Sequence, residues 1–272
     1  MRPTRSRAAP ALINDDVDFD RAHTQAPYRV RFEWGQSGAA ALTAPGVDAA
    51  VVVDVLSFTT SVSIAATRGV TVYPYRWRDA GAAAYAMRKG AKLAVGRFEA
   101  RSATSGAHVS LSPAAMERIE GVERLVLPSP NGSTICFELA DSGAAVYAAS
   151  LRNAGAVARA LQPLLADGGT VAVVAAGERW PDESLRPAWE DLWGAGAVIA
   201  ALAGADVEGI SPEAQAASNA YHQIATATEQ ALMTVASGVE LVEKGYRTDV
   251  EAAARVDVDD VAPRLIEAAF RA

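Results

Sequence analysis

Ala49-Ala50-Val51-Val52-Val53-Asp54-Val55-Leu56-Ser57-Phe58-Thr59-Thr60-Ser61 is the stretch that decides the fold of this chain. Its first eight residues form an apolar, largely β-branched run that only Asp54 interrupts, which is typical of a strand buried on both faces of a parallel sheet. The hydroxyl cluster that follows favours helix capping, and the pattern from Val62 to Ala66 predicts a helix that ends at Gly69. We interpret the segment as one strand-helix unit.

The same alternation recurs along the chain and predicts an α/β fold with a mostly parallel sheet covered by helices, followed by a helical C-terminal segment. Strands are expected at 28–34, 70–75, 92–95, 124–127, 144–149 and 170–175. Helices are expected at 79–89, from the 128–134 turn to Leu139, at 153–165, at 188–203, in one long segment from Ser211, and at 249–254. Residues 35–45 are expected to be a connection, and the stretch after 254 has no defined element.

Length and composition set the class of protein. The chain has 272 residues, half of them apolar, which is enough for one large α/β domain or two small ones. We expect a flexible tail over residues 1–26 and the α/β region over 27–272, with no internal boundary that the sequence resolves. The start of the chain lacks the apolar stretch of a secretory signal.

Charge and cysteine content limit the kinds of partner, binding site and cellular location that we expect. The formal charge of −7 gives no overall attraction to nucleic acid or to an anionic membrane, so neither is expected as a partner. No apolar run approaches the roughly 18 residues of a membrane span. The single cysteine, Cys136, excludes an internal disulfide and a cysteine-rich zinc site and is expected to be a buried thiol. A cytoplasmic location follows as the expectation.

Polar residues at the end of the first strand form the first candidate loop. Asp54 is a carboxylate at the end of a buried strand, and Ser57, Thr59 and Thr60 follow it. A buried carboxylate is costly unless it is paired or bound to a metal, so Asp54 is a candidate metal ligand. The alternative is a helix cap or a hydrogen-bonded anchor for a neighbouring loop.

The second candidate loop is a turn at the start of an expected helix. Its short hydroxyls and backbone N–H groups suit the binding of phosphate oxygens. An ordinary turn with a helix cap is the alternative, because such turns select the same residue types. The residues concerned are Ser129, Pro130, Asn131, Gly132, Ser133 and Thr134.

The third candidate loop carries an unusual density of charge. Arg179 and Arg186 each offer a planar fork to phosphate, sulfonate or carboxylate, whereas Glu190 and Asp191 are candidate magnesium ligands. Alternatively, the two acids serve the dipole of the helix that begins after Pro187, and the arginines pair with nearby acids.

Several familiar signatures are missing from the sequence. There is no Walker phosphate loop, and Cys136 lacks the arginine of a cysteinyl phosphatase. Gly194-Ala195-Gly196 is expected to pack closely within a helix, and the acidic run Asp257-Val258-Asp259 is expected in a surface loop. The histidines have no metal-ligand spacing, and of the three only His108 lies in a candidate site loop.

Taken together, the three loops resemble the 2-phosphosulfolactate phosphatase family, through DVLSFTTS, PNGST and GER...RPAWEDLWGAGAVI in that order and spacing. The resemblance extends over Val47 to Pro263. It implies an α/β fold and magnesium-dependent hydrolysis of phosphosulfolactate to sulfolactate and phosphate. It also implies that Asp54, Glu190 and Asp191 are metal-site carboxylates. The chain departs from the family pattern at Ser57, where that pattern has arginine.

Our working hypothesis is a Mg²⁺-dependent phosphatase that acts on a small phosphorylated acid. A binding protein that holds such an acid without hydrolysing it is the leading alternative. A homo-oligomer built on Trp180, Trp189 and Trp193 is a third, although two tryptophans four residues apart on a helix are expected to face the core. The catalytic candidates are Asp54, Asn131, Arg179 and Glu190, and the substrate-binding candidates are Ser57, Thr59, Thr60, Ser129, Gly132, Ser133, Thr134, Glu178 and Arg186.

Overall fold

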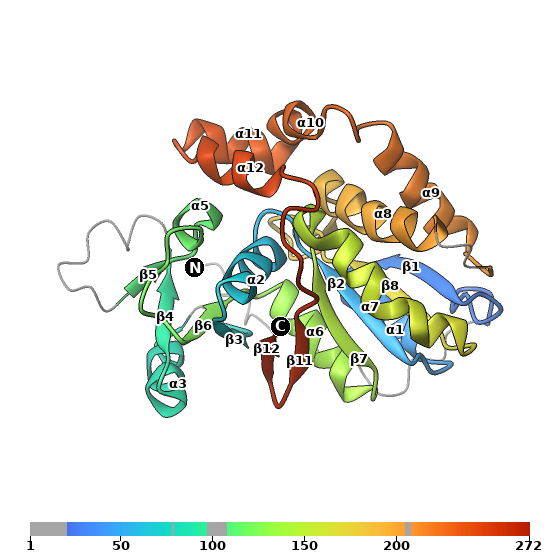
Figure 1. The fold of residues 1–272 in the computed structure, drawn as a ribbon, viewed down its shortest axis with the longest axis horizontal. Coiled ribbons are helices and arrows are strands. Elements are labelled where there is room, and N and C mark those ends of the chain that lie inside the picture. Colours follow the sequence, from blue (N-terminus) through green and yellow to red (C-terminus); the bar gives the residue numbers. More distant parts are fainter. Residues whose placement is uncertain (1–20, 78, 97–107, 205–207) are drawn as a thin grey trace, which may run out of the picture.

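The computed structural model describes residues 21–77, 79–96, 108–204 and 208–272 (Figure 1). Most of its strands form one ten-stranded sheet, in the spatial order β1-β8-β2-β7-β11-β12-β3-β6-β4-β5. The decisive strand, β2 (Ala49–Val53), lies inside this sheet and is buried along its whole length. Val51 and Val53 face one hydrophobic core while Ala50 and Val52 face another, so the prediction that this strand is covered on both faces is confirmed.

The sheet consists of two parallel halves, and the prediction of a mostly parallel α/β fold is confirmed. Strands in each half pair only in parallel with one another, as expected where helices connect them. The first half contains β1 (Val30–Trp34), β8 (Val171–Ala175), β2 and β7 (Ala145–Ala149). The second half contains β3 (Thr71–Tyr75), β6 (Arg124–Pro128), β4 (Lys92–Val95) and β5 (His108–Ser110).

An antiparallel hairpin from the C-terminal part of the chain joins the two halves. β11 (Arg264–Ile266) pairs with β7, and β12 (Ala269–Arg271) pairs with β3. Phe270 is fully buried there, and its ring lies 6.3 Å from the ring of Phe58 in an edge-on contact. The sequence assigned no element to this stretch because strands of three residues are too short to show a period.

Helices cover both faces of the first half (Figure 1). One core includes side chains of α7, α8 and α9, and the other includes those of α1, α2 and α6. α3 packs against β4 and β6 of the second half, whereas α10 to α12 form a separate layer above the strand ends. The bounds are α1 (Gly35–Thr43), α2 (Phe58–Thr67), α3 (Gly81–Lys89), α5 (Pro113–Met116), α6 (Gly132–Asp141), η1 (Leu151–Asn153), α7 (Ala154–Ala166), α8 (Trp189–Ala203), α9 (Pro212–His222), α10 (Thr228–Thr234), α11 (Ala236–Glu243) and α12 (Arg247–Ala253).

One expectation about helices is wrong, and another gains detail. The stretch 35–45 was expected to be a connection, but it forms α1, whose Ala39 and Leu42 are buried against the sheet. The long helical segment expected from Ser211 consists of three helices, α9, α10 and α11. Val235 between α10 and α11 is extended, and a Cβ on Gly238 would lie 1.8 Å from the carbonyl oxygen of Leu232, so these two helices approach closely only because residue 238 is glycine.

The expected close packing of the glycine pair in α8 is confirmed. A Cβ added to Gly194 would lie 2.6 Å from Cγ2 of Val55, and one added to Gly196 would lie 2.1 Å from the carbonyl oxygen of Ala217. α8 therefore approaches both the strand end and α9 at backbone distance. No helix in the described ranges combines the length and the apolar character that crossing a bilayer requires.

The acidic run near the C-terminus lies in a loop with Asp257 and Val258 exposed, as predicted, but Asp259 is not a surface residue, which corrects the prediction for that position. Asp259 is buried and accepts two hydrogen bonds from Arg152, at 2.7 Å from Nε and 3.0 Å from Nη2. Ser63 donates to the same carboxylate at 2.8 Å, and Arg152 also bonds Glu117 at 3.1 Å. This buried ion-pair cluster ties the segment after α12 to α2 and to the loop that follows β7.

Residues 1–20 of the expected N-terminal tail lie outside the described residues. In the remainder, Gln25 is buried, and its side-chain amide donates to the carbonyl of Phe32 at 2.8 Å and accepts from the Phe32 N–H at 3.1 Å. The packed part of the chain therefore includes residue 25.

Candidate active site

The turn after β2 is stabilised by the hydroxyls that the sequence singled out. Thr59 Oγ1 donates to the carbonyl of Asp54 at 2.8 Å and accepts from the Asp54 N–H at 2.9 Å. Thr60 Oγ1 donates to the carbonyl of Val55 at 2.8 Å, and both threonines are fully buried. These bonds end β2 at Val53, three residues earlier than the apolar run predicts. Both threonine side chains are therefore bonded to the backbone of the turn.

Asp54 caps the helix that follows it. Its Oδ1 accepts from the N–H of Phe58 at 3.1 Å, whereas the side chain of Ser57 makes no capping bond, which corrects the expectation that the hydroxyls cap this helix. The carboxylate also lies against a second helix, because a Cβ on Gly132 would be 2.9 Å from Asp54 Oδ2. Asp54 thus stands at the N-termini of α2 and α6, where helix dipoles favour negative charge.

A cavity of about 260 Å³, here named the strand-end cavity, opens at this point. Six of the predicted site residues line it together, from all three candidate loops. They are Asp54, Ser57, Ser129, Asn131, Glu178 and Arg179; Leu56, Phe58, Ser61, Leu111, Leu127, Pro128 and Pro130 complete the lining.

The turn at the start of α6 supplies one wall of the cavity. Ser129 Oγ accepts from the N–H of Gly132 at 3.2 Å, and Thr134 Oγ1 donates to the carbonyl of Pro130 at 2.6 Å. Ser133 is fully buried, and its hydroxyl has no hydrogen-bond partner among the described residues. The turn is therefore internally braced, and a buried hydroxyl still has hydrogen-bonding capacity.

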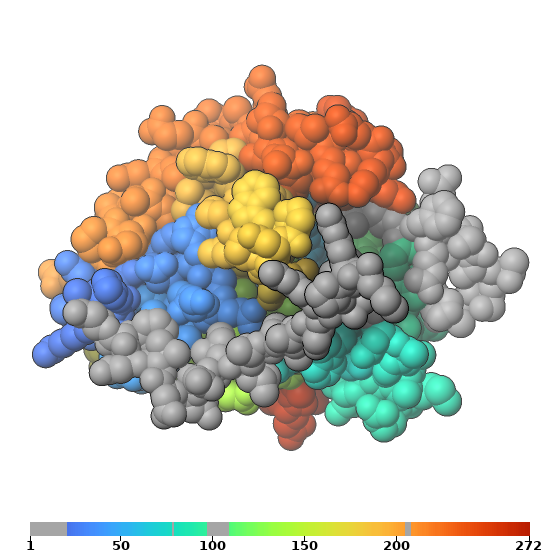
Figure 2. Space-filling view, turned by 180° about the vertical axis from the view of Figure 1, so that it is seen from behind, coloured from blue at the N-terminus to red at the C-terminus, as the bar shows by residue number. Residues whose placement is uncertain are grey.

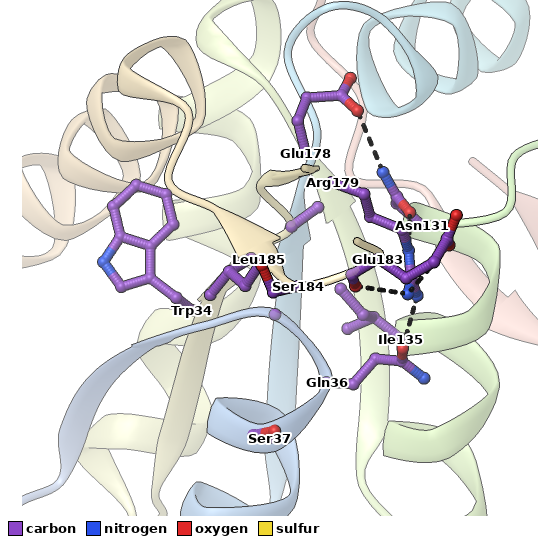
Figure 3. A pocket seen from close by; sticks show the side chains of 12 residues that line it. Trp34, Gln36, Ser37, Asn131, Ile135, Glu178, Arg179, Glu183, Ser184 and Leu185 are labelled. Atoms are coloured by element: carbon purple, nitrogen blue, oxygen red, sulfur yellow. Dashed lines mark hydrogen bonds and ion pairs between the residues drawn. The ribbon is translucent and has the colours of Figure 1, made fainter. Parts of the chain in front are cut away.

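Arg179, like Asn131 and Glu178, lines both the strand-end cavity and a second cavity of about 250 Å³, here named the side cavity and drawn in Figure 3. Its guanidinium donates from Nε to Asn131 Oδ1 at 3.0 Å, from Nη2 to Gln36 Oε1 at 2.8 Å, and from Nη1 to the carbonyl of Glu183 at 3.3 Å. Trp34 and Leu185 supply apolar lining of the side cavity. The guanidinium of Arg179 is thus available to both the strand-end cavity and the side cavity.

Asp191 joins the ends of two strands. Its Oδ1 accepts from the N–H of Val55 at 2.7 Å, and its Oδ2 accepts from the N–H of Gly177 at 2.9 Å. Burial raises its pKa well above the usual range for a carboxyl group, and the nearby charges of Asp54 and Glu190 raise it further. The residue therefore fixes the backbone of β2 and the loop after β8 in relation to each other.

A comparison with protein-family models decides the family. The model described as 2-phosphosulpholactate phosphatase matches residues 40–268. The chain belongs to that family. The match confirms the resemblance inferred from the three loops, and a phosphatase is the activity the family indicates. A comparison with curated proteins found no match.

The remaining acids of this phosphatase-family site form a partly buried group beside the strand-end cavity. Burial raises the pKa of Glu178, the charge of Arg186 lowers it, and the charge of Glu190 raises it. Glu190 itself is buried in the first turn of α8. The described ranges contain no cluster of three or more acidic, histidine or cysteine side chains arranged to hold a metal ion.

Arg186 lies outside the lining of both cavities. Its guanidinium stands 5.8 Å from the centre of the Trp180 ring and donates to Ser237 Oγ at 3.2 Å. It therefore connects the segment that carries β9 (Glu178–Arg179) and β10 (Leu185–Arg186) to α11. Figure 2 shows this segment (yellow) at the surface beneath the C-terminal helices (orange to red).

Of the two tryptophans on α8, Trp193 packs against the core as expected, whereas Trp189 does not. Trp189 was expected to face the core with Trp193, but 59% of its surface is exposed, and the two rings lie 6.1 Å apart. Trp180 is 52% exposed. His108, which was expected in a site loop, is the first residue of β5. Gln36, which holds Arg179, was missed because its helix was not predicted.

Proposed function

We propose that this chain is a magnesium-dependent phosphatase that hydrolyses a small phosphorylated hydroxy acid similar to 2-phosphosulfolactate. The observation that carries the proposal is the strand-end cavity, where the N-termini of α2 and α6 meet Asp54 and Arg179. Helix N-termini and a guanidinium are the groups that bind phosphate in proteins, and here they converge on one hollow.

In this proposal the phosphoryl group lies at the start of α6. Ser129 and Asn131 line the cavity there, and the N-terminus of α6 presents the positive end of its dipole to the phosphoryl oxygens. Arg179 lines the same cavity and offsets the charge that develops on the transferring group. Such fixed donors accelerate a reaction because they need no reorganisation when the charge moves.

Magnesium fits the chemistry of the donors, although not as a cage made of protein alone. Mg²⁺ is commonly held by one or two carboxylates, with water and substrate phosphate completing its octahedron. We propose Asp54 as the principal ligand, with Glu190 next to it. Both oxygens of Asp191 already accept backbone N–H groups, so Asp191 supports the site by fixing the strand ends. A bound magnesium ion would supply Lewis-acid polarisation of a phosphoryl oxygen.

Water is the nucleophile in this scheme, and Glu178 is the group best placed for proton transfer. It lines the strand-end cavity, and burial raises its pKa, which moves a carboxyl group towards the range useful for general acid-base work. Its Oε2 accepts from Asn131 Nδ2 at 3.3 Å, so the side chain is held at the cavity.

Phosphate release tests the proposal. The purified protein is incubated with a panel of phosphorylated hydroxy acids that includes 2-phosphosulfolactate, first with magnesium and then with excess chelator. We expect metal-dependent release, and a loss of about 10²- to 10³-fold in kcat for Asp54→Asn, comparable with removal of an electrostatic stabiliser elsewhere. Asp260→Asn is the matched control, because Asp260 is exposed, pairs with Arg159 at the surface and lines neither cavity. Unchanged turnover by Asp54→Asn would exclude the assignment.

A binding protein without catalysis is the second candidate, and Ser57 favours it. Ser57 lines the strand-end cavity at the position where the family pattern has arginine, so one bidentate phosphate contact is missing. This candidate predicts no phosphate release across the panel, together with a rise in Tm when a phosphorylated acid is added. We propose a cytoplasmic location for either activity, because a lone buried thiol suits a reducing compartment.

A further inference from the structure

Arg179 lies at the centre of a hydrogen-bonded chain that extends beyond both cavities. On one side Gln36 accepts from its Nη2 at 2.8 Å, and Gln36 Nε2 in turn donates to Glu138 Oε1 at 2.7 Å. On the other side Asn131 accepts from its Nε at 3.0 Å, and Asn131 Nδ2 donates to Glu178 Oε2 at 3.3 Å. One amide therefore separates the guanidinium from a carboxylate on each side.

The chemistry of the partners fixes which way the Gln36 amide points. A guanidinium only donates and an ionised carboxylate only accepts. The oxygen of Gln36 must therefore face Arg179, and its nitrogen must face Glu138. A reversed amide would oppose donor to donor and acceptor to acceptor. The link from Arg179 through Gln36 to Glu138, here named the arm, therefore has one favourable arrangement.

The same arm gives a half-buried charge a partner. One carboxylate oxygen of Glu138, Oε2, is buried and has no hydrogen-bond partner among the described residues. Burial raises the pKa of Glu138, while the hydrogen bond from Gln36 and the charges of Arg76 and Arg179 lower it. The nearby charge of Asp141 raises it. The hydrogen bond from Gln36 thus favours the ionised form of Glu138, and the charges of Arg76 and Arg179 add to this effect.

The arm also joins separate parts of the fold. Gln36 lies in the first turn of α1, Glu138 lies in α6, and Arg179 belongs to β9. α1 and α6 pack against each other, whereas β9 belongs to a short two-stranded ribbon outside the main sheet. Within its own segment the guanidinium of Arg179 contacts only the exposed Glu183, through its carbonyl at 3.3 Å and its carboxylate at 3.8 Å, among the interactions of the described residues. A link to two packed helices supplies a further constraint.

We infer that Gln36 and Glu138 form a positioning relay that holds the guanidinium of Arg179 between the strand-end cavity and the side cavity. They act through Arg179 and do not contact the phosphoryl group. The consequence for catalysis rests on the proposed function, because it assumes that Arg179 meets substrate. The holding of Arg179 does not rest on it and is measured separately.

Chemical labelling tests the relay without any substrate. Phenylglyoxal modifies accessible arginines, and mass spectrometry of the Arg179 peptide reports its rate. For Gln36→Met we expect labelling of Arg179 about fivefold faster, as for the loss of one hydrogen bond. Gln215→Met is the matched control, because that glutamine is exposed on α9 and its side chain donates to Asn219, which is also on α9. An unchanged labelling rate in Gln36→Met would overturn the relay.

An exchange of partners distinguishes a relay from general support of the fold. In Glu138→Lys an ammonium group faces the donating nitrogen of Gln36, so we expect the arm to open and Arg179 to be labelled faster than in the wild type. Adding Gln36→Glu places one acceptor between the two cations and should return the rate to within about twofold. A double variant that labels no more slowly than Glu138→Lys would contradict the inference.

Kinetics then separate the relay from the proposed function. If the wild type releases phosphate, Gln36→Met should lower kcat/KM about tenfold with an unchanged Tm, and the double variant should recover most of the loss that Glu138→Lys causes. Normal kinetics in Gln36→Met would refute a catalytic role for the relay. A wild type that releases no phosphate would refute the proposed function, while the labelling rates would still decide the relay.

Discussion

Gly132→Ala is the most informative single change at the site. A Cβ at this position would lie 2.4 Å from Cδ1 of Phe58, 3.1 Å from its Cε1 and 2.9 Å from Asp54 Oδ2. The ring of Phe58 is buried and packs against Phe270, so it has little room to move away. The substitution therefore forces α6 away from the strand-end turn.

The expected cost follows from two opposing effects. Overpacking a buried site costs about 1–3 kcal/mol. Replacing glycine by alanine in a helix returns up to about 1 kcal/mol, and less in the first turn. We expect a net loss of about 1–2 kcal/mol in the free energy of unfolding. For a domain of this size each kcal/mol lowers Tm by about 2–4 °C.

Thermal and urea unfolding measure this effect, with phosphate release as a second readout. Gly204→Ala is the matched control, because a Cβ there would meet the carbonyl oxygen of Ala200 at an ordinary 3.5 Å. Adding Phe58→Leu to Gly132→Ala should recover part of the activity, since it removes the clashing ring atoms. A Gly132→Ala protein as stable and as active as the wild type would refute the packing argument.

Two other features give further predictions. Asp259→Asn should lower the free energy of unfolding by about 3–5 kcal/mol, because it leaves the buried guanidinium of Arg152 without its bidentate partner; a loss below about 1 kcal/mol in urea unfolding would contradict this. Burial raises the pKa of Glu178, so the folded protein favours the protonated form of this side chain. Its contribution to stability is therefore fully present below the unfolded pKa of about 4.3, and it is lost as the pH rises through the raised pKa of the folded state. Glu178→Gln should therefore reduce the fall in unfolding free energy between about pH 4 and pH 7, and an unaltered pH slope would argue against the assignment.

The sequence predicts the parts of the site that depend on strand order. Asp54, Asn131 and Arg179 each follow an apolar run, and the ends of such strands meet where ligands bind in α/β folds. Their meeting in one cavity agrees with that rule. The family match covers residues 40–268, a range that includes the three loops. Local chemistry and spacing were enough for this level of prediction.

The missing parts of the site depend on contacts that no local pattern encodes. Gln36 and Glu138 are 102 residues apart in sequence and meet only because α1 packs on α6. The stretch that forms α1 consists mainly of glycine, alanine and small polar residues, and these give too weak a period to predict a helix. Asp191 was identified as a site residue, but the two backbone N–H groups that it accepts come from two other loops.

The hairpin of β11 and β12 sets the order in which the sheet can be completed during synthesis. Every other strand of both halves precedes it in the chain, so β7 and β3 remain unpaired on their facing edges until residues 264–271 have been made. Exposed strand edges promote association between nascent chains. Phe270 then enters the core beside Phe58, so a strand that is made after both halves of the sheet also completes the packing behind Asp54.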